Sequence, residues 1–217
     1  MNRRSFLKAA AIVGGTLAVR EVGGMALKKA ISGKKTVLAI DGGMAGGTSD
    51  YALSVVGETL REEGVDFEVI HIGEAVLRGC TACRSCRREE RACVLATEEE
   101  IRWIEAMKRA NAVVLAAPTC FGGIPGTMKS FLDKAFFANS KHFKGKTGAA
   151  VVTTPRTGAS MTFEGLNQYF TICEMPVASS TYWNNVRGLT VDDLKNDAEG
   201  IRTMQNLGRN IAKLIKN

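Results

Sequence analysis

The chain has 217 residues, of which 45% are hydrophobic and 24% charged, as expected for one globular domain with an additional segment. Its net charge of +7 arises near the N-terminus, because residues 1–35 hold eight positive side chains and one negative. Residues 36–217 carry 21 of each sign, so the body of the chain is neutral. The composition excludes a disordered tail protein and a multi-span membrane protein. The charge distribution removes the main argument for nucleic-acid binding.

The first 26 residues have the pattern of an export signal. A basic head, MNRRSFLK, precedes the 11 uncharged residues 9–19, which are too few to cross a bilayer. The paired arginines followed by SFLK resemble a twin-arginine leader. This resemblance predicts a signal peptide over 1–26, a basic lead-in over 27–35, and export to the periplasm or cell envelope, with no transmembrane span in the mature protein. Because that route carries folded proteins, a cofactor inserted before export is expected. The alternative is a basic helix at the start of a cytoplasmic protein.

The remainder, residues 36–217, alternates between strand and helix patterns. Apolar and β-branched runs predict strands at 36–41, 66–72, 112–117, 147–153 and 175–180. Helical periodicity predicts helices at 48–63, 97–110, 125–137, 161–172 and 192–217. The alternation predicts an α/β fold with a doubly wound parallel sheet, and five strands fit the flavodoxin-like order 2-1-3-4-5. Ligands of such sheets bind beyond the carboxyl ends of the strands, so the loops after strands 1, 3 and 4 should form the site.

The loop after the first predicted strand is rich in glycine. Backbone N–H groups of such a loop, together with those of the following helix, bind phosphate. Thr48 stands where a P-loop requires lysine, and there is no G-x-G-x-x-G, so neither an NTPase nor a dinucleotide-binding protein is favoured. The phosphate of FMN fits this loop, and an ordinary glycine-rich turn is the alternative. The candidate FMN-binding residues here are Gly42, Gly43, Gly46, Gly47, Thr48 and Ser49.

The segment after the third predicted strand carries a family resemblance. It reads APTCFGGIPGTMKSFLD, a proline-led turn followed by a helix of the form Pro-x-x-Met-Lys-x-Phe-x-Asp. This resembles the flavodoxin-like NADPH-dependent FMN reductase family, although Cys120 replaces the usual aromatic residue and Phe121 follows it. The resemblance implies FMN contacts in this loop and in the loop after the fourth strand. These residues are Pro118, Thr119, Cys120, Phe121, Gly122 and Gly123, then Thr154, Pro155, Arg156, Thr157 and Gly158.

Four of the six cysteines lie within the segment 79–94. They are Cys80, Cys83, Cys86 and Cys93. Closely repeated C-x2-C spacing with a fourth cysteine nearby is typical of a [4Fe–4S] cluster. Structural zinc usually uses two C-x2-C pairs across a longer gap, and disulfides suit an exported protein, so both remain alternatives.

The cysteine segment is similar to that of the iron–sulfur flavoproteins, a branch of the same family. The resemblance covers roughly residues 36–188 and implies a [4Fe–4S] cluster near the flavin of a neighbouring subunit. It therefore also implies a homo-oligomer, either a dimer or a tetramer. The first loop departs from the family, which often has a Ser-Pro-Arg-like start where this chain has Gly42-Gly43-Met44.

Taken together, these features predict an exported, FMN-binding electron-transfer oxidoreductase that exchanges electrons with a redox partner protein or a small molecule. No separate acid–base or nucleophile set is recognisable. The alternatives are an NAD(P)H-dependent FMN or quinone reductase without a cluster, and a flavin-free flavodoxin-fold binding protein. Since the body shows no nicotinamide motif, a protein or quinone-like donor is expected rather than free NAD(P)H. Cys173 is expected to be buried. Cys120 is expected to be buried as well, with a flavin-ring contact or a redox role as the alternative, and His71 and His142 are expected to be structural or surface residues.

Overall fold

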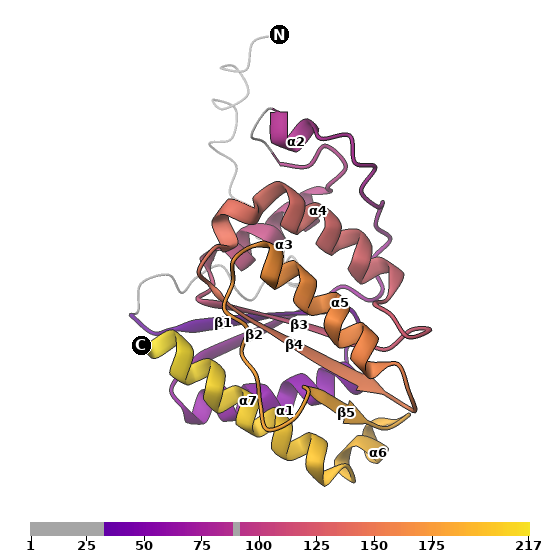
Figure 1. The fold of residues 1–217 in the computed structure, drawn as a ribbon, viewed down its shortest axis with the longest axis vertical. Helices are drawn as coiled ribbons and strands as arrows, with labels where there is room; N and C mark the ends of the chain where they lie inside the picture. The colour runs from indigo at the N-terminus through magenta and orange to yellow at the C-terminus, as the bar shows by residue number, and fades with distance from the viewer. Residues whose placement is uncertain (1–32, 89–91) are drawn as a thin grey trace, which may run out of the picture. The chain divides into compact units, whose positions relative to one another are not determined.

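The computed structural model describes residues 33–88 and 92–217, so the predicted signal peptide lies outside the described residues. A five-stranded parallel sheet with the order β2-β1-β3-β4-β5 forms its centre (Figure 1). The predicted doubly wound, flavodoxin-like topology is therefore confirmed. The strands are β1 (Thr36–Asp41), β2 (Asp66–His71), β3 (Ala112–Pro118), β4 (Thr147–Thr154) and β5 (Asn185–Arg187).

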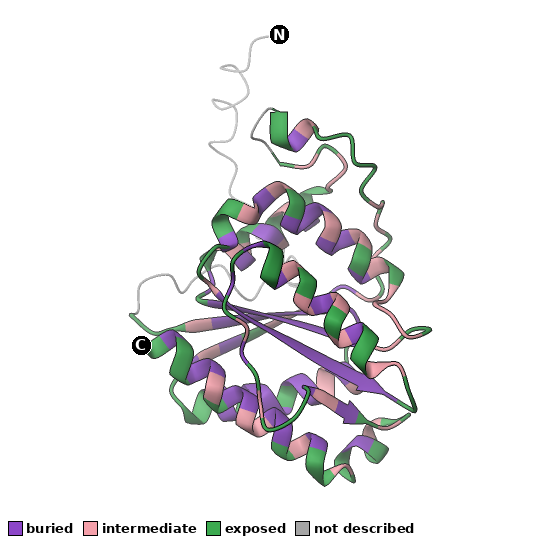
Figure 2. Ribbon diagram, viewed as in Figure 1, coloured by how far each residue is buried: buried purple, intermediate pink, exposed green. Residues whose placement is uncertain are grey.

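Helices cover both faces of the sheet. They are α1 (Thr48–Glu62), α2 (Ser85–Arg88), α3 (Glu98–Arg109), α4 (Gly126–Phe143), α5 (Ala159–Ile172), α6 (Val191–Lys195) and α7 (Ala198–Lys216). Helices α1 and α7 lie on one face, and α3, α4 and α5 lie on the other (Figure 1). Each face has its own apolar core, and the purple strands in Figure 2 show that the sheet between them is buried. Strand β3 is an unbroken apolar run because both of its faces are covered. None of the described helices is long and apolar enough to span a bilayer.

The fifth strand lies later in the chain than predicted. Residues 175–180 make a single bridge, between Val177 and Gly148, and the strand pairing with β4 resumes only at β5. Between these points the backbone is held by α7, since the Ser180 hydroxyl donates to the Thr203 carbonyl at 2.6 Å and the Asn210 amide donates to the Ser179 carbonyl at 2.7 Å. The predicted strand at 175–180 is therefore wrong beyond this bridge, where Gly148 exchanges backbone hydrogen bonds with Pro176 and Ala178 and the chain then leaves the sheet.

Two of the predicted helices also differ in extent: the one predicted at 125–137 continues to Phe143 in α4, and the last one is interrupted. The last predicted helix is divided into α6 and α7, because Asp197 caps a new helix by accepting a hydrogen bond from the Gly200 N–H at 3.0 Å. The cysteine segment contains the short helix α2, which was not predicted. The predicted start of the helix after the cysteines is confirmed: Thr97 and Glu100 form the two halves of a capping box.

Candidate functional site

Three loops meet at the carboxyl edge of the sheet, where the sequence places the flavin site. The hydroxyls of Thr48 in the first loop and Thr153 at the end of β4 share a hydrogen bond of 2.9 Å. The backbone N–H of Thr119 donates to the Thr153 carbonyl at 2.8 Å, and the Thr162 hydroxyl donates to Thr119 Oγ1 at 3.2 Å. The loops that follow β1, β3 and β4 are therefore joined directly, through threonines, into one surface.

The first loop closes tightly and leaves the start of α1 open. A side chain at Gly43 would place its Cβ 2.1 Å from Ser49 Oγ, and one at Gly47 would lie 2.9 Å from the Met44 carbonyl oxygen. Gly47 is the N-cap residue of α1 and offers no side-chain acceptor to the first turn. The first N–H groups of this helix, beginning at Thr48, therefore face out of the loop, as phosphate binding requires.

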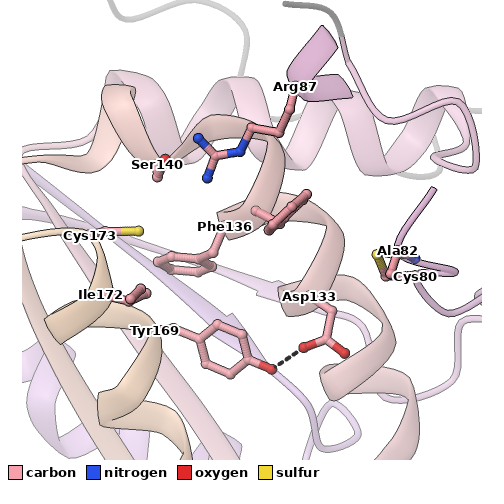
Figure 3. Close-up of a pocket in the computed structure, with 10 residues that line it drawn as sticks. Cys80, Ala82, Arg87, Asp133, Phe136, Ser140, Tyr169, Ile172 and Cys173 are labelled. Carbon is pink, nitrogen blue, oxygen red and sulfur yellow. Dashed lines mark hydrogen bonds between the residues drawn. The ribbon is translucent and has the colours of Figure 1, made fainter. Parts of the chain in front are cut away.

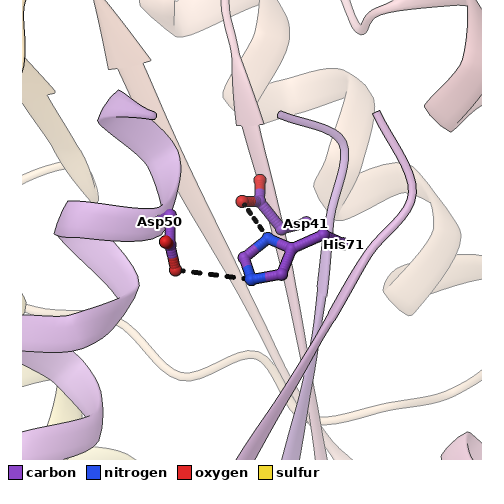
Figure 4. Close-up of side chains that lie close together, drawn as sticks. All are labelled: Asp41, Asp50 and His71. Carbon is purple, nitrogen blue, oxygen red and sulfur yellow. Dashed lines mark hydrogen bonds and ion pairs between the residues drawn. The ribbon is translucent and has the colours of Figure 1, made fainter. Parts of the chain in front are cut away.

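A charged network that the sequence did not reveal lies beside this loop. The Asp41 carboxylate is completely buried at the end of β1 and accepts hydrogen bonds from the Gly43 N–H at 2.8 Å and from Ser49. His71 stands between two carboxylates: its Nδ1 is 3.1 Å from Asp41 Oδ2 and its Nε2 is 3.6 Å from Asp50 Oδ1 (Figure 4). These contacts show that His71 belongs to a charged network at the site, whereas the sequence indicated only a structural or surface residue.

The same network could in principle hold a cation, because the three side chains bring their ligand atoms within 4.8 Å of one another. Both imidazole nitrogens of His71 already face carboxylates, and Asp50 accepts the Gly46 N–H at 2.7 Å. Each of the three side chains therefore has a hydrogen-bond partner within the protein. Burial raises the pKa of Asp41 above its usual value, although hydrogen bonds from Ser49 and Gly43 and the charge of His71 act in the opposite direction.

The second loop forms a tight turn with an exposed aromatic tip. The N–H groups of Cys120 and Gly123 each donate to the other's carbonyl, at 3.0 and 2.8 Å. Phe121 at the tip has a φ of 49° and a fully exposed side chain. The turn uses the N–H groups of Cys120 and Gly123, so the N–H groups of Phe121 and Gly122 remain available to a bound ring. Cys120 is exposed, so the expectation that it is buried is wrong.

The third loop packs against the second through glycine. Gly158 has a φ of 86° and begins α5, and a Cβ there would lie 2.8 Å from the Gly122 Cα. Within the loop, the Thr154 hydroxyl donates to the Thr157 carbonyl at 3.0 Å. The predicted flavin-binding residues from 154 to 158 thus adjoin those from 118 to 123. Arg156 lies exposed at the rim of this surface.

The cysteine segment forms a separate, winding loop between β2 and α3. Its backbone reverses at Ala82 and Arg84, which have φ values of 54° and 60°. The Ala82 N–H donates to Cys80 Sγ at 3.4 Å, and hydrogen bonds from Ser85 hold the pKa of the Cys83 thiol below its usual value. Left-handed residues and N–H groups directed at sulfur are what a loop needs to wrap a metal cluster.

The cysteines differ in their exposure. Cys80 and Cys83 are exposed, Cys86 is buried, and Cys93 is partly buried. Burial raises the pKa of Cys86, and the charges of Cys93 and Cys83 raise it further, so these three thiols lie within electrostatic reach of one another. All four are free thiols in the structure. Among the described residues, however, only Asp41, Asp50 and His71 bring three ligand atoms within 4.8 Å of each other.

The sheet order defines a flavodoxin-like fold, and the three loops join into one surface at the carboxyl edge of its sheet. Residues 36–188 match the sequence profile of the NADPH-dependent FMN reductase family, which is 153 of the chain's 217 residues. The chain belongs to this family. It is an FMN-binding, flavin-dependent oxidoreductase with an electron-transfer role.

Similar proteins of known sequence point to one branch of the family. An iron-sulfur flavoprotein of Methanocaldococcus jannaschii is 27% identical over 165 residues, which is 72% of this chain and 84% of that protein. An iron-sulfur flavoprotein of Methanosarcina thermophila is 23% identical over 73% of this chain and 83% of its own length. These relatives support the predicted branch as well as the family.

Solved structures agree on the fold. A flavodoxin from an archaeon has a TM-score of 0.56 at 16% identity, covering 84% of this chain and 99% of its own. A WrbA-like flavodoxin from Agrobacterium tumefaciens has a TM-score of 0.59 at 16% identity, covering 84% of this chain and 98% of its own.

Proposed function

We propose that the protein is an iron–sulfur flavoprotein that holds FMN on its three joined loops and a [4Fe–4S] cluster on Cys80, Cys83, Cys86 and Cys93. The observation that carries the proposal is the combination in one chain of a flavin-type loop surface with four closely spaced, unpaired thiols. When bound, FMN accepts electrons in pairs or singly and an iron–sulfur cluster exchanges them singly, so the two together convert between these modes.

The residues of the first loop fit the FMN phosphate. Thr48 and Ser49 offer the open N–H groups of the α1 terminus, and the two glycines before them carry no Cβ. No lysine or arginine occurs from Gly42 to Ser49. Binding through backbone N–H groups is therefore the main interaction that this loop supplies.

The second and third loops fit the ring. The N–H groups of Phe121 and Gly122 would donate to it, which favours the reduced form because reduced flavin accumulates negative charge. The exposed Phe121 ring would cover one of its edges and exclude water. Gly158 keeps the third loop close enough to complete the surface.

A visible spectrum with metal analysis tests the proposal directly. Protein purified without oxygen should contain FMN, iron and acid-labile sulfide, with about four irons per chain. Flavin without iron would support the alternative, a reductase without a cluster, and zinc in its place would assign the cysteines to a structural site. A colourless protein that does not take up added FMN would refute the flavin assignment.

We also propose that the electron donor is a protein or a quinone-like molecule and that the protein is exported as a homo-oligomer. The basis for export is the twin-arginine pattern of residues 3–8. The basis for the donor is that nicotinamide nucleotides are cytoplasmic metabolites, which an exported protein does not meet. Replacing Arg3 and Arg4 together by lysine should retain the protein in the cytoplasm, as cell fractionation would show. Export of that variant at the normal rate would refute the leader assignment. Light scattering on the cofactor-loaded protein tests the oligomer, and a monomeric mass would exclude it.

A further inference from the structure

A cavity of about 560 Å³ lies between the cysteine loop and helices α4 and α5. Cys80 and Ala82 of the loop form one side of it (Figure 3). Phe136 and Phe137 of α4 and Ile172 of α5 form the other side. Because this part of the loop lies over a cavity rather than over a packed core, each contact that does join the loop to α4 carries a large share of the attachment.

One such contact is made by Arg87 of the short helix α2. Its guanidinium carbon lies 4.8 Å from the centre of the Phe137 ring, within the range of a cation–π contact. Figure 3 shows the Arg87 side chain extending from α2 over the cavity. Burial raises the pKa of Cys173, and the charge of Arg87 acts in the opposite direction, so the guanidinium lies within electrostatic reach of the end of α5. The contact therefore joins the helix that carries Cys86 to the helices that form the cavity.

The two ends of the cysteine loop are also attached to α4. At the start of the loop, a Cβ at Gly79 would lie 3.7 Å from Ser130 Oγ. After its end, Lys134 pairs with Glu100, whose side chain caps the start of α3. Ser130, Lys134 and Phe137 are separated by four and three residues, so they lie on one face of α4. One face of a single helix therefore holds the loop at its start, at α2 and beyond its end.

From this arrangement we infer that Arg87 is a positioning residue, whose contact with Phe137 holds α2, and with it the Cys86 thiol, against α4. The inference rests on the proposed function, in which Cys86 is one of the four cluster ligands. Helix α4 begins directly after the second flavin-type loop, and its Met128 packs against the first, where a Cβ at Gly42 would lie 2.8 Å from Met128 Cβ. The contact would thus fix the cluster ligands relative to the flavin-type surface.

Iron release from the anaerobically purified holoprotein to a chelator tests the contact. Loss of an exposed cation–π contact corresponds to about a two- to fivefold change in an opening equilibrium. Arg87→Met and Phe137→Leu should each release iron faster by about this factor, and the double variant no faster than the more affected single variant, because both remove the same contact. Both single variants should keep the urea midpoint of the wild type, since Arg87 is exposed and Phe137 is 39% exposed.

Two matched variants separate the contact from charge and from packing. Arg88→Met removes the same charge from the next residue of α2, which is also exposed, and should release iron as the wild type does. Phe137→Tyr keeps an aromatic ring under Arg87 and should likewise behave as the wild type. Acceleration by Arg88→Met equal to that by Arg87→Met would assign the effect to charge and overturn the inference.

Hydrogen exchange of the full chain measures the same opening without depending on iron. Amides of α2 should exchange about two to five times faster in Arg87→Met and Phe137→Leu than in the wild type, whereas those of β3 should not change. Unchanged exchange at α2, or unchanged iron release, in these two variants would overturn the inference. A wild-type protein that binds no iron would refute the proposed cluster, and exchange at α2 would then still decide whether Arg87 holds the loop.

Discussion

The buried ion pair between Glu100 and Lys134 allows a direct test of how α3 packs against α4. Lys134 on α4 and Glu100 on α3 are in contact, and their side chains are 0% and 1% exposed. Among the described residues, Lys134 Nζ and Glu100 Oε1 have no partner other than each other. The other oxygen of Glu100 accepts the Thr97 N–H at 2.9 Å and so fixes the start of α3, four residues after Cys93.

Replacing Lys134 by methionine should therefore be costly. The methionine fills a similar volume, but the Glu100 carboxylate is left buried without a counter-charge, and loss of one partner of a buried pair costs about 3–5 kcal/mol. For a domain of this size that is a fall of about 6–20 °C in the unfolding temperature, at about 2–4 °C per kcal/mol. The double variant Glu100→Gln/Lys134→Met keeps an amide oxygen for the capping box and removes both charges, so it should recover most of the loss.

Urea unfolding followed by circular dichroism measures these differences. The control is Lys108→Met, which removes the 2.8 Å pair with Glu105 from the surface of α3 and should cost no more than about 1 kcal/mol. If Lys134→Met and Lys108→Met prove equally stable, the pair is not buried as the structure shows. If the double variant is as unstable as Lys134→Met, packing rather than the unpaired carboxylate accounts for the loss.

Four further predictions concern the cofactors and the first loop. Cys83→Ser should lose its iron and keep its α/β circular dichroism, whereas Cys120→Ser should keep full iron content; retained iron in Cys83→Ser would contradict the ligand assignment. Gly158→Ala, with a φ of 86° and a Cβ 2.8 Å from Gly122, should weaken FMN binding at least tenfold in a fluorescence titration, whereas Gly64→Ala, with a φ of 73° and open space, should not. The raised pKa of Asp41 means that the folded protein binds the carboxyl proton more tightly than the unfolded chain does. The wild type therefore loses stability as the pH rises from the unfolded pKa of about 3.8 to the folded pKa, and Asp41→Asn should gain stability relative to it over that window. A constant difference between the two across this window would contradict the assignment. NADH and NADPH at micromolar concentration should reduce the bound flavin slowly, and rapid bleaching by either would favour a nicotinamide-dependent reductase.

The parts of the fold that the sequence could predict are those in which local pattern and tertiary environment agree. Strand β3 is apolar throughout because it is covered on both faces, so its sequence alone indicates a central parallel strand. The start of α3 is marked by Thr97 and Glu100, whose side chains cap the helix whatever surrounds it. Strand β5 could not be placed in this way. The run at 175–180 has strand propensity, but it pairs with β4 only at Val177, and Ser179 and Ser180 bond instead to α7, which comes later in the chain.

The site shows the same division between local and long-range determinants. Glycine spacing indicated the first loop because glycines are required there by contacts within a few residues, such as that between Gly43 and Ser49. His71 on β2 pairs with Asp41 on β1 and with Asp50 on α1, and no residue close to His71 in the sequence indicates these contacts. The pairing brings one imidazole and two carboxylates together beside the first loop, from three different elements of the fold. His71 is therefore brought to the site by the folding of β1, β2 and α1 together, and its own neighbours in the sequence could not reveal that position.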